Sequence, residues 1–150
     1  MVNHVVFFKS TCGLRWGDHL SVVLFVIAGE VLSRGLNALL DQPRFTLFSV
    51  ARKATSVSHL AYVDDIIIFS RGDPWSLRCV MQILQDYQDC SCQLINKDKS
   101  YFLTSSKCSS SRRAVVAKLT GFSYKSFLVK YLGCPLFLGR KVRSLFSRLI

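Results

Sequence analysis

Acidic side chains are missing from the last third of the chain: residues 101–150 contain ten Lys and Arg but no Asp or Glu. Residues 1–70 hold six basic and five acidic residues, and residues 71–100 hold four of each. Almost the whole net charge of +11 therefore lies after residue 100. A charge of this sign and size favours a polyanionic partner, either a nucleic acid or an anionic membrane surface.

Long apolar runs are also missing. The longest run, Leu20 to Gly29, includes Ser21 and is followed by Glu30, whereas a membrane-spanning helix needs about 20 apolar residues. Residues 1–9 lack the basic region and the small-residue cleavage site of a signal peptide. We therefore expect an intracellular protein, nuclear or cytoplasmic, that is not secreted and has no membrane partner.

The six cysteines lack the spacing of a zinc site, because the tightest pair is Cys90 and Cys92 and no CxxC occurs. In an intracellular protein we expect reduced thiols with no disulfide partner. Half of the 150 residues are apolar, which excludes disorder and allows a core in one domain, or in a piece of a larger one.

Apolar periodicity and turn residues predict an α+β fold in which helices pack on one face of an antiparallel sheet. Asp73-Pro74 is a strong helix start, and two acidic residues between β-rich runs indicate a hairpin turn. The predicted elements are a helix over 20–40, strands over 59–63 and 66–70, a helix from Asp73 to about Cys90, a strand over 99–104, a helix over 110–119 capped by Ser110 or Ser111, and a hairpin over 129–138 with Gly133 and Pro135 as turn residues.

Asp64 and Asp65 are the most informative residues, because two adjacent carboxylates interrupt the apolar run from Leu60 to Phe69. Such charges must be solvated, paired or bound to a metal ion. A tight turn would present a carboxylate at its tip, where Mg²⁺ takes one or two carboxylates and the phosphate oxygens of a substrate. An ordinary acidic turn is the simpler interpretation of these two residues taken alone.

Three other segments are weak signals individually. Residues 13–21 place two glycines before a helix, which suits a phosphate but also an ordinary loop and cap. Lys99, in residues 94–100, would suit a leaving phosphate but also a polar turn. Residues 129–136 form a plain hairpin pattern.

The order of the four segments is more specific. GLRxGDxLS at 13–21, AYxDD at 61–65, LINxxKS at 94–100 and KYLGxPL at 130–136 resemble the reverse transcriptase domain of non-LTR (LINE-type) retrotransposons, especially those of plant genomes. The resemblance runs from about Phe7 to about Arg143. It implies a partial palm of a right-hand polymerase over residues 1–143, followed by the start of a truncated segment over 144–150.

The resemblance also implies roles for individual residues. Asp64 would be a Mg²⁺ ligand supported by Asp65, and Lys99 would lie near the leaving pyrophosphate. The remaining implied roles are template and nucleotide binding for Gly13, Arg15, Gly17, Asp18 and Ser21, primer grip for Tyr131, Leu132 and Gly133, and phosphate contacts for Arg112, Arg113, Lys118, Lys130 and Lys141. The partners would be an RNA template, a DNA primer and deoxynucleotides.

The chain departs from the family pattern in ways that put activity in doubt. Trp16, His19 and Val22 replace a glutamine and two prolines, Cys12 replaces an arginine, and Cys92 replaces a glycine that allows a tight turn. The family's other metal-binding aspartate, from an upstream strand, has no counterpart, and we expect the fingers and thumb to be missing. The resemblance thus implies an RNA-directed DNA polymerase fragment that holds Mg²⁺ weakly or not at all and is inactive alone. The alternatives are a non-catalytic basic remnant that binds nucleic acid, or an unstable pseudogene product.

Overall fold

The computed structural model describes residues 19–45, 57–126 and 129–135. The chain divides into two compact units, Met1–Ile95 and Asn96–Ile150. Eight basic and eight acidic residues balance in the first unit, whereas the second unit holds twelve basic residues against the single acid Asp98. The whole formal charge of +11 therefore belongs to the second unit.

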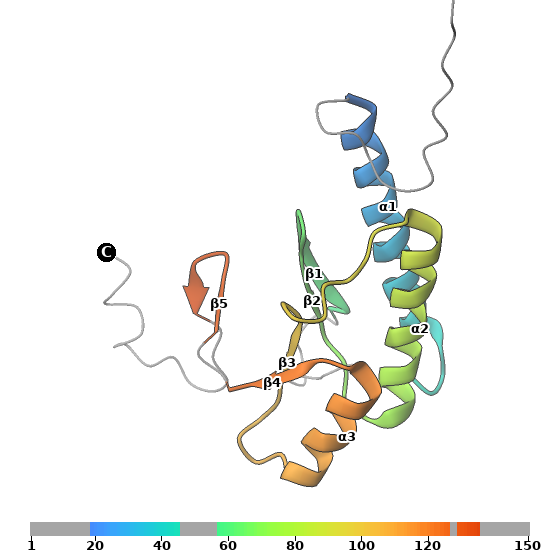
Figure 1. The fold of residues 1–150 in the computed structure, drawn as a ribbon. Coiled ribbons are helices and arrows are strands. Elements are labelled where there is room, and N and C mark those ends of the chain that lie inside the picture. The colour runs from blue at the N-terminus through green and yellow to red at the C-terminus, as the bar shows by residue number, and fades with distance from the viewer. Residues whose placement is uncertain (1–18, 46–56, 127–128, 136–150) are drawn as a thin grey trace, which may run out of the picture. The chain divides into compact units, whose positions relative to one another are not determined.

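The first unit consists of two helices and a hairpin. Its elements are α1 (His19–Ala38), a short 3₁₀ helix η1 (Leu39–Asp41), β1 (His59–Tyr62), β2 (Asp65–Ile68) and α2 (Pro74–Ser91). Helices α1 and α2 lie side by side (Figure 1). The buried apolar side chains of this unit come from α1, η1 and α2: Leu32, Leu36, Leu39, Leu77, Val80 and Leu84.

Gly35 sets how closely the two helices approach. A Cβ atom at this position would stand 3.0 Å from Cγ2 of Ile83 on α2, which is closer than carbon atoms normally pack. The missing side chain therefore lets the backbone of α1 approach α2 at this level.

Helix α2 begins and ends as its sequence predicts. The Asp73 carboxylate accepts hydrogen bonds from the backbone N–H groups of Trp75 (3.1 Å) and Ser76 (3.0 Å), and Pro74 occupies the first helical position. Burial raises the pKa of Asp73, but these bonds and one from the Ser76 hydroxyl outweigh burial and leave the pKa lowered. Cys92 ends the helix in the left-handed conformation with φ 57°.

The N-terminal half of α1 exposes apolar side chains around most of its circumference. Val22 is 65% exposed, Val26 61% and Ile27 53%. The stretch His19–Asp41 is 23 residues long and contains an 18-residue window of mean hydropathy 1.7, so by length and composition it is long and apolar enough to cross a membrane. The helix is thus longer than the apolar run from Leu20 to Gly29, whose shortness argued against a membrane-spanning helix. A single helix of this kind is weak evidence for a membrane-spanning segment, because the core helices of soluble proteins pass the same test.

The second unit contains β3 (Tyr101–Leu103), α3 (Ser110–Thr120), β4 (Ser123–Lys125), β5 (Lys130–Tyr131) and β6 (Cys134–Pro135). Strands β3 and β4 pair in parallel, with α3 as the connection between them. The side chains of Val116 and Thr120, on one side of α3, are buried. Gly121 ends the helix with a φ of 71°. Strands β5 and β6 form a separate antiparallel hairpin.

The predicted α+β class is confirmed, and four details differ from the prediction. The β3–β4 pairing is parallel rather than antiparallel, and strand β4 was not predicted. Ser109, not Ser110 or Ser111, caps α3 by accepting a hydrogen bond from the Arg112 N–H group. Pro135 lies in β6 and not in the turn.

Candidate active site

Asp64 and Asp65 lie at the tip of the β1–β2 hairpin. Tyr62 pairs with Asp65, so Val63 and Asp64 form a two-residue loop. Val63 has φ 49°, a left-handed conformation that glycine normally fills at the first loop position and that strains a β-branched residue. The hairpin therefore presents Asp64 at its tip and Asp65 as the first residue of β2, and it stores strain beside both carboxylates.

The hairpin tip is open to solvent. Both carboxylates are exposed, and Val63 is 67% and Tyr62 59% exposed. No third His, Cys, Asp or Glu joins the pair in a group that could hold a metal ion among residues 19–45, 57–126 and 129–135. In the described part of the chain, the two carboxylates thus offer a partial ligand set that fits a hard cation whose other ligands are phosphate oxygens and water.

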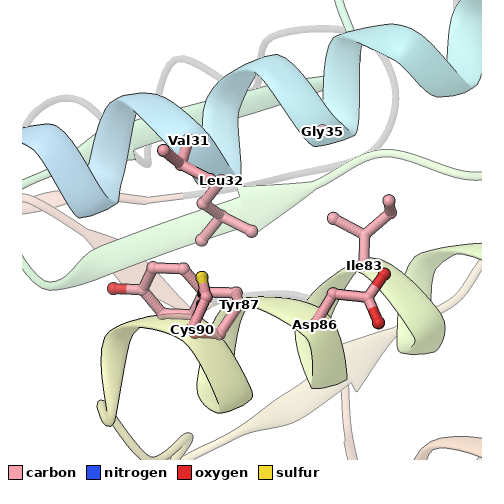
Figure 2. Close-up of a pocket in the computed structure, with 7 residues that line it drawn as sticks. All are labelled: Val31, Leu32, Gly35, Ile83, Asp86, Tyr87 and Cys90. Atoms are coloured by element: carbon pink, nitrogen blue, oxygen red, sulfur yellow. Dashed lines mark hydrogen bonds between the residues drawn. The ribbon is translucent and has the colours of Figure 1, made fainter.

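Tyr87 of α2 has a pKa above its ordinary value. Burial is the main cause that raises the pKa of Tyr87, a hydrogen bond with Ser91 lowers it in part, and Cys90 and Asp64 add smaller increases. The Tyr87 hydroxyl donates a hydrogen bond to Oε1 of Gln93. Tyr87 lines a groove of about 300 Å³ between α1 and α2, and Figure 2 shows its ring opposite Leu32 and beside Cys90. The groove is mostly apolar and contains neither hairpin carboxylate.

In the second unit, Asn96 shapes the turn that carries Lys99. The Asn96 side-chain oxygen accepts hydrogen bonds from the backbone N–H groups of Asp98 (3.0 Å) and Lys99 (3.1 Å). The Asn96 carbonyl oxygen accepts from the N–H group of Ser100 (3.0 Å) and from its hydroxyl (2.7 Å). Asparagine and serine at these two positions thus close a compact turn, and the Lys99 side chain is exposed on it.

The predicted primer-grip residues lie in the turn of the β5–β6 hairpin. Tyr131 pairs with Cys134, which leaves Leu132 and Gly133 as the two loop residues. Both have positive φ, 50° and 81°, as the tight turn that matches strand twist requires. Gly133 suits this conformation, whereas Leu132 is strained in it and is 50% exposed.

The predicted phosphate contacts in α3 do not share one face. Arg112 and Lys118 are exposed, and their spacing of six residues places them on different sides of the helix. Arg113 is half-buried, with its guanidinium 4.5 Å from the ring centre of Tyr124 and its Nε atom buried without a hydrogen-bond partner. Lys130, at the start of β5, is exposed.

The predicted nucleotide and template residues fall mostly beyond the described structure. Ser21, half-buried in the first turn of α1, is described. Gly13, Arg15, Gly17, Asp18 and Lys141 lie outside the described residues.

His59 was not singled out from the sequence. Its ring is bonded on both sides: Nε2 lies 2.8 Å from the Ser33 hydroxyl and Nδ1 lies 2.8 Å from the Ser58 hydroxyl. Burial lowers the pKa of His59, which favours the neutral ring. The sequence signal that could have identified His59 is the Ser58-His59 pair at the start of the strand that leads to Asp64 and Asp65.

Comparison with known proteins agrees with the motif order. Residues 2–136 match the family model described as "Reverse transcriptase (RNA-dependent DNA polymerase)". No curated protein and no solved structure matches the chain.

Proposed function

Because the chain belongs to the reverse transcriptase family, we propose that it provides the palm portion of an enzyme that adds deoxynucleotides to a DNA primer on an RNA template. The observation that carries the proposal is the exposed Asp64-Asp65 pair at a strained hairpin tip in a chain of this family. The order of the four sequence boxes supports a LINE-type element of plant origin as the source. We also propose an intracellular location, nuclear or cytoplasmic, as expected for an enzyme that acts on an RNA template and a DNA primer.

The two carboxylates, Lys99 and the Leu132-Gly133 turn each have a task in this proposed reaction. Asp64 and Asp65 bind a divalent cation, of which Mg²⁺ is the best match to carboxylate and phosphate ligands. That ion, when bound, supplies charge neutralisation for the nucleotide phosphates and activation of the primer hydroxyl. The Asn96 turn orients Lys99 as a cationic donor for the leaving pyrophosphate. The Leu132-Gly133 turn contacts the primer backbone.

We expect Asp64 and Asp65 to bind a cation weakly. With two carboxylates and no third protein ligand beside them in the described residues, the affinity depends on substrate phosphates. We therefore propose that this chain, purified alone, does not extend a primer. Primer extension by the purified chain that disappears in Asp64→Asn would contradict this statement.

Cation binding itself tests the site directly. Mn²⁺, a paramagnetic replacement for Mg²⁺, is expected to broaden the amide signals of Val63, Asp64 and Asp65 in a spectrum of the full chain. Asp64→Asn should weaken binding at least about tenfold, the low end of the cost of losing even a supporting partner. Asp89→Asn, which removes an exposed carboxylate from α2, is the matched control. Equal broadening in both variants would refute the assignment.

A second function rests on the distribution of charge. The second unit carries twelve basic residues against one acidic residue, and those on α3 surround the helix rather than forming a stripe. This arrangement supports binding of the nucleic-acid backbone without sequence preference. The binding would be independent of the carboxylates, and it is the property that a non-catalytic remnant would keep.

Salt dependence measures this second function. The logarithm of the affinity for DNA should fall with the logarithm of salt concentration by about 0.9 for each phosphate contacted. Lys118→Gln should reduce that slope by about one. Arg78→Gln, which removes an exposed charge from α2 in the first unit, should leave the slope unchanged. An affinity that does not change between low and moderate salt would exclude this function.

A further inference from the structure

Four polar side chains connect the base of the β1–β2 hairpin to helix α1. The Ser33 hydroxyl of α1 lies 2.8 Å from Nε2 of His59, and Nδ1 of His59 lies 2.8 Å from the Ser58 hydroxyl. The Ser58 hydroxyl in turn donates to Oδ1 of Asn37, one helical turn after Ser33, over 2.7 Å. The hairpin base is therefore bonded to two successive turns of α1.

The donors and acceptors run in one direction along these bonds. Ser58 has a single hydroxyl hydrogen and donates it to Asn37, so the bond between Ser58 and His59 must be donated by the ring at Nδ1. A neutral ring then has Nε2 as its acceptor, which takes the hydrogen of Ser33. The lowered pKa of His59 agrees with this neutral form. Each bond is thus satisfied by one arrangement of hydrogens, and aligned bonds of this kind reinforce one another.

The bonds lie at the end of the hairpin that is buried. Ser58 is 6% exposed, and its carbonyl oxygen accepts a 2.8 Å hydrogen bond from the Phe69 N–H group, which closes the open end of the hairpin. Leu60, Tyr62, Val63 and Ile66, farther along, are exposed. Because burial is concentrated at its base, the direction in which the hairpin projects depends on how that base is held.

A Ser-His pair also occurs in nucleophilic catalysis, and the geometry of Ser33 decides against that role. Ser33 lies in the interior of α1, where backbone N–H groups are used within the helix. Helix α1 therefore offers no free amide donor of its own beside the Ser33 hydroxyl to stabilise an oxyanion.

We propose that the Ser33–His59–Ser58–Asn37 hydrogen bonds are a positioning device that holds the Asp64-Asp65 tip in its orientation relative to α1. His59 is a positioning residue, since it acts through the hairpin and contacts no reacting atom. The role of the tip rests on the proposed function, whereas the anchoring of the hairpin does not.

Hydrogen exchange in the full chain tests the anchoring. Ser33→Ala removes one bond of the set, and loss of one such bond should speed exchange of the Phe69 amide about fivefold. The amides of α2 around Val80 and Leu84 should be unaffected. Ser33→Thr, which keeps a hydroxyl, should restore protection of Phe69. The matched control is Ser91→Ala, which removes the 2.6 Å bond from the Ser91 hydroxyl to the Tyr87 carbonyl oxygen at the end of α2.

The outcomes separate this proposal from the proposed function. Unchanged Phe69 exchange in Ser33→Ala, or equal acceleration in the hairpin and in α2, would overturn the positioning role. The same variant should weaken Mn²⁺ binding at the tip by about fivefold, and faster exchange with unchanged Mn²⁺ affinity would also overturn the positioning role. Absence of Mn²⁺ binding in the unaltered chain would instead count against the proposed function, and the exchange data would still decide the anchoring.

Discussion

Replacing Val63 by glycine is expected to stabilise the chain, although it removes a hydrophobic side chain. Val63 has φ 49°, and an L-residue in this region pays about 1–2 kcal/mol for the crowding of Cβ against the backbone. Against this gain stands the extra chain entropy of glycine, about 0.5–1 kcal/mol. Because the side chain is 67% exposed, little buried apolar area is lost. The net stabilisation is about 0.5–1 kcal/mol.

The assay is equilibrium unfolding of the full chain, followed in parallel by circular dichroism and by tryptophan fluorescence. For a chain of this size, 1 kcal/mol corresponds to a rise of about 2–4 °C in Tm. Val63→Ala keeps Cβ and should recover little of the strain. Val23→Gly, at a 56% exposed valine in helix α1, should destabilise, because glycine is a poor helix residue.

The sign of the two glycine substitutions is the decisive result. If Val63→Gly lowers the Tm as Val23→Gly does, the loop does not hold Val63 at positive φ and the hairpin is not strained. If Val63→Ala stabilises as much as Val63→Gly, the β-branch rather than Cβ is the source of the strain.

The other predictions concern caps, packing and pH. Asp73→Ala should cost about 1 kcal/mol of stability. Because the pKa of Asp73 is lowered in the folded state, this stability is present above pH 3.8, the ordinary pKa of the group. In an acid titration it is lost as the pH falls through the folded-state pKa. Cys92→Gly should raise the Tm, because Cys92 has φ 57° and pays about 1–2 kcal/mol for it. Gly35→Leu should lower the Tm by forcing α1 away from Ile83, while Gly35→Ala should be nearly neutral, since about 1 kcal/mol of helix propensity offsets the 3.0 Å approach. Burial lowers the pKa of His59, so the stability that the neutral ring contributes should be fully present above pH 6.5 and should decrease as the pH falls below that value. His59→Gln should remove this pH dependence from a titration of the Tm.

Local chemistry made much of the fold predictable. Asp73-Pro74 predicts the start of α2 because the carboxylate and the proline ring satisfy the first turn without help from the rest of the chain. Asp64-Asp65 predicts a turn between two β-rich runs, and the structure has that turn one residue earlier: Val63 and Asp64 form the loop, and Asp65 is the first residue of β2. At Cys92 it was the family resemblance, not the local sequence, that implied a glycine, and the φ of 57° explains why a glycine suits this position.

What depends on distant residues was not predictable. Strand β4 is three residues long and reads Ser-Tyr-Lys, so it carries no apolar run, and its parallel pairing is set by the α3 connection rather than by its own side chains. The bonds of His59 join β1 to a helix 26 residues earlier, a separation that no local pattern reports. In the site, the sequence indicated the two carboxylates but not what holds them.

The division of charge between the two units also governs solubility. A protein surface with no net charge and exposed apolar side chains has poor colloidal stability near neutral pH. The first unit has both properties, since its eight basic and eight acidic residues cancel and α1 exposes Val22, Val26 and Ile27. We therefore expect the polycationic second unit to raise the solubility of the whole chain, and we expect cleavage between Ile95 and Asn96 to make the unit that contains the carboxylates less soluble.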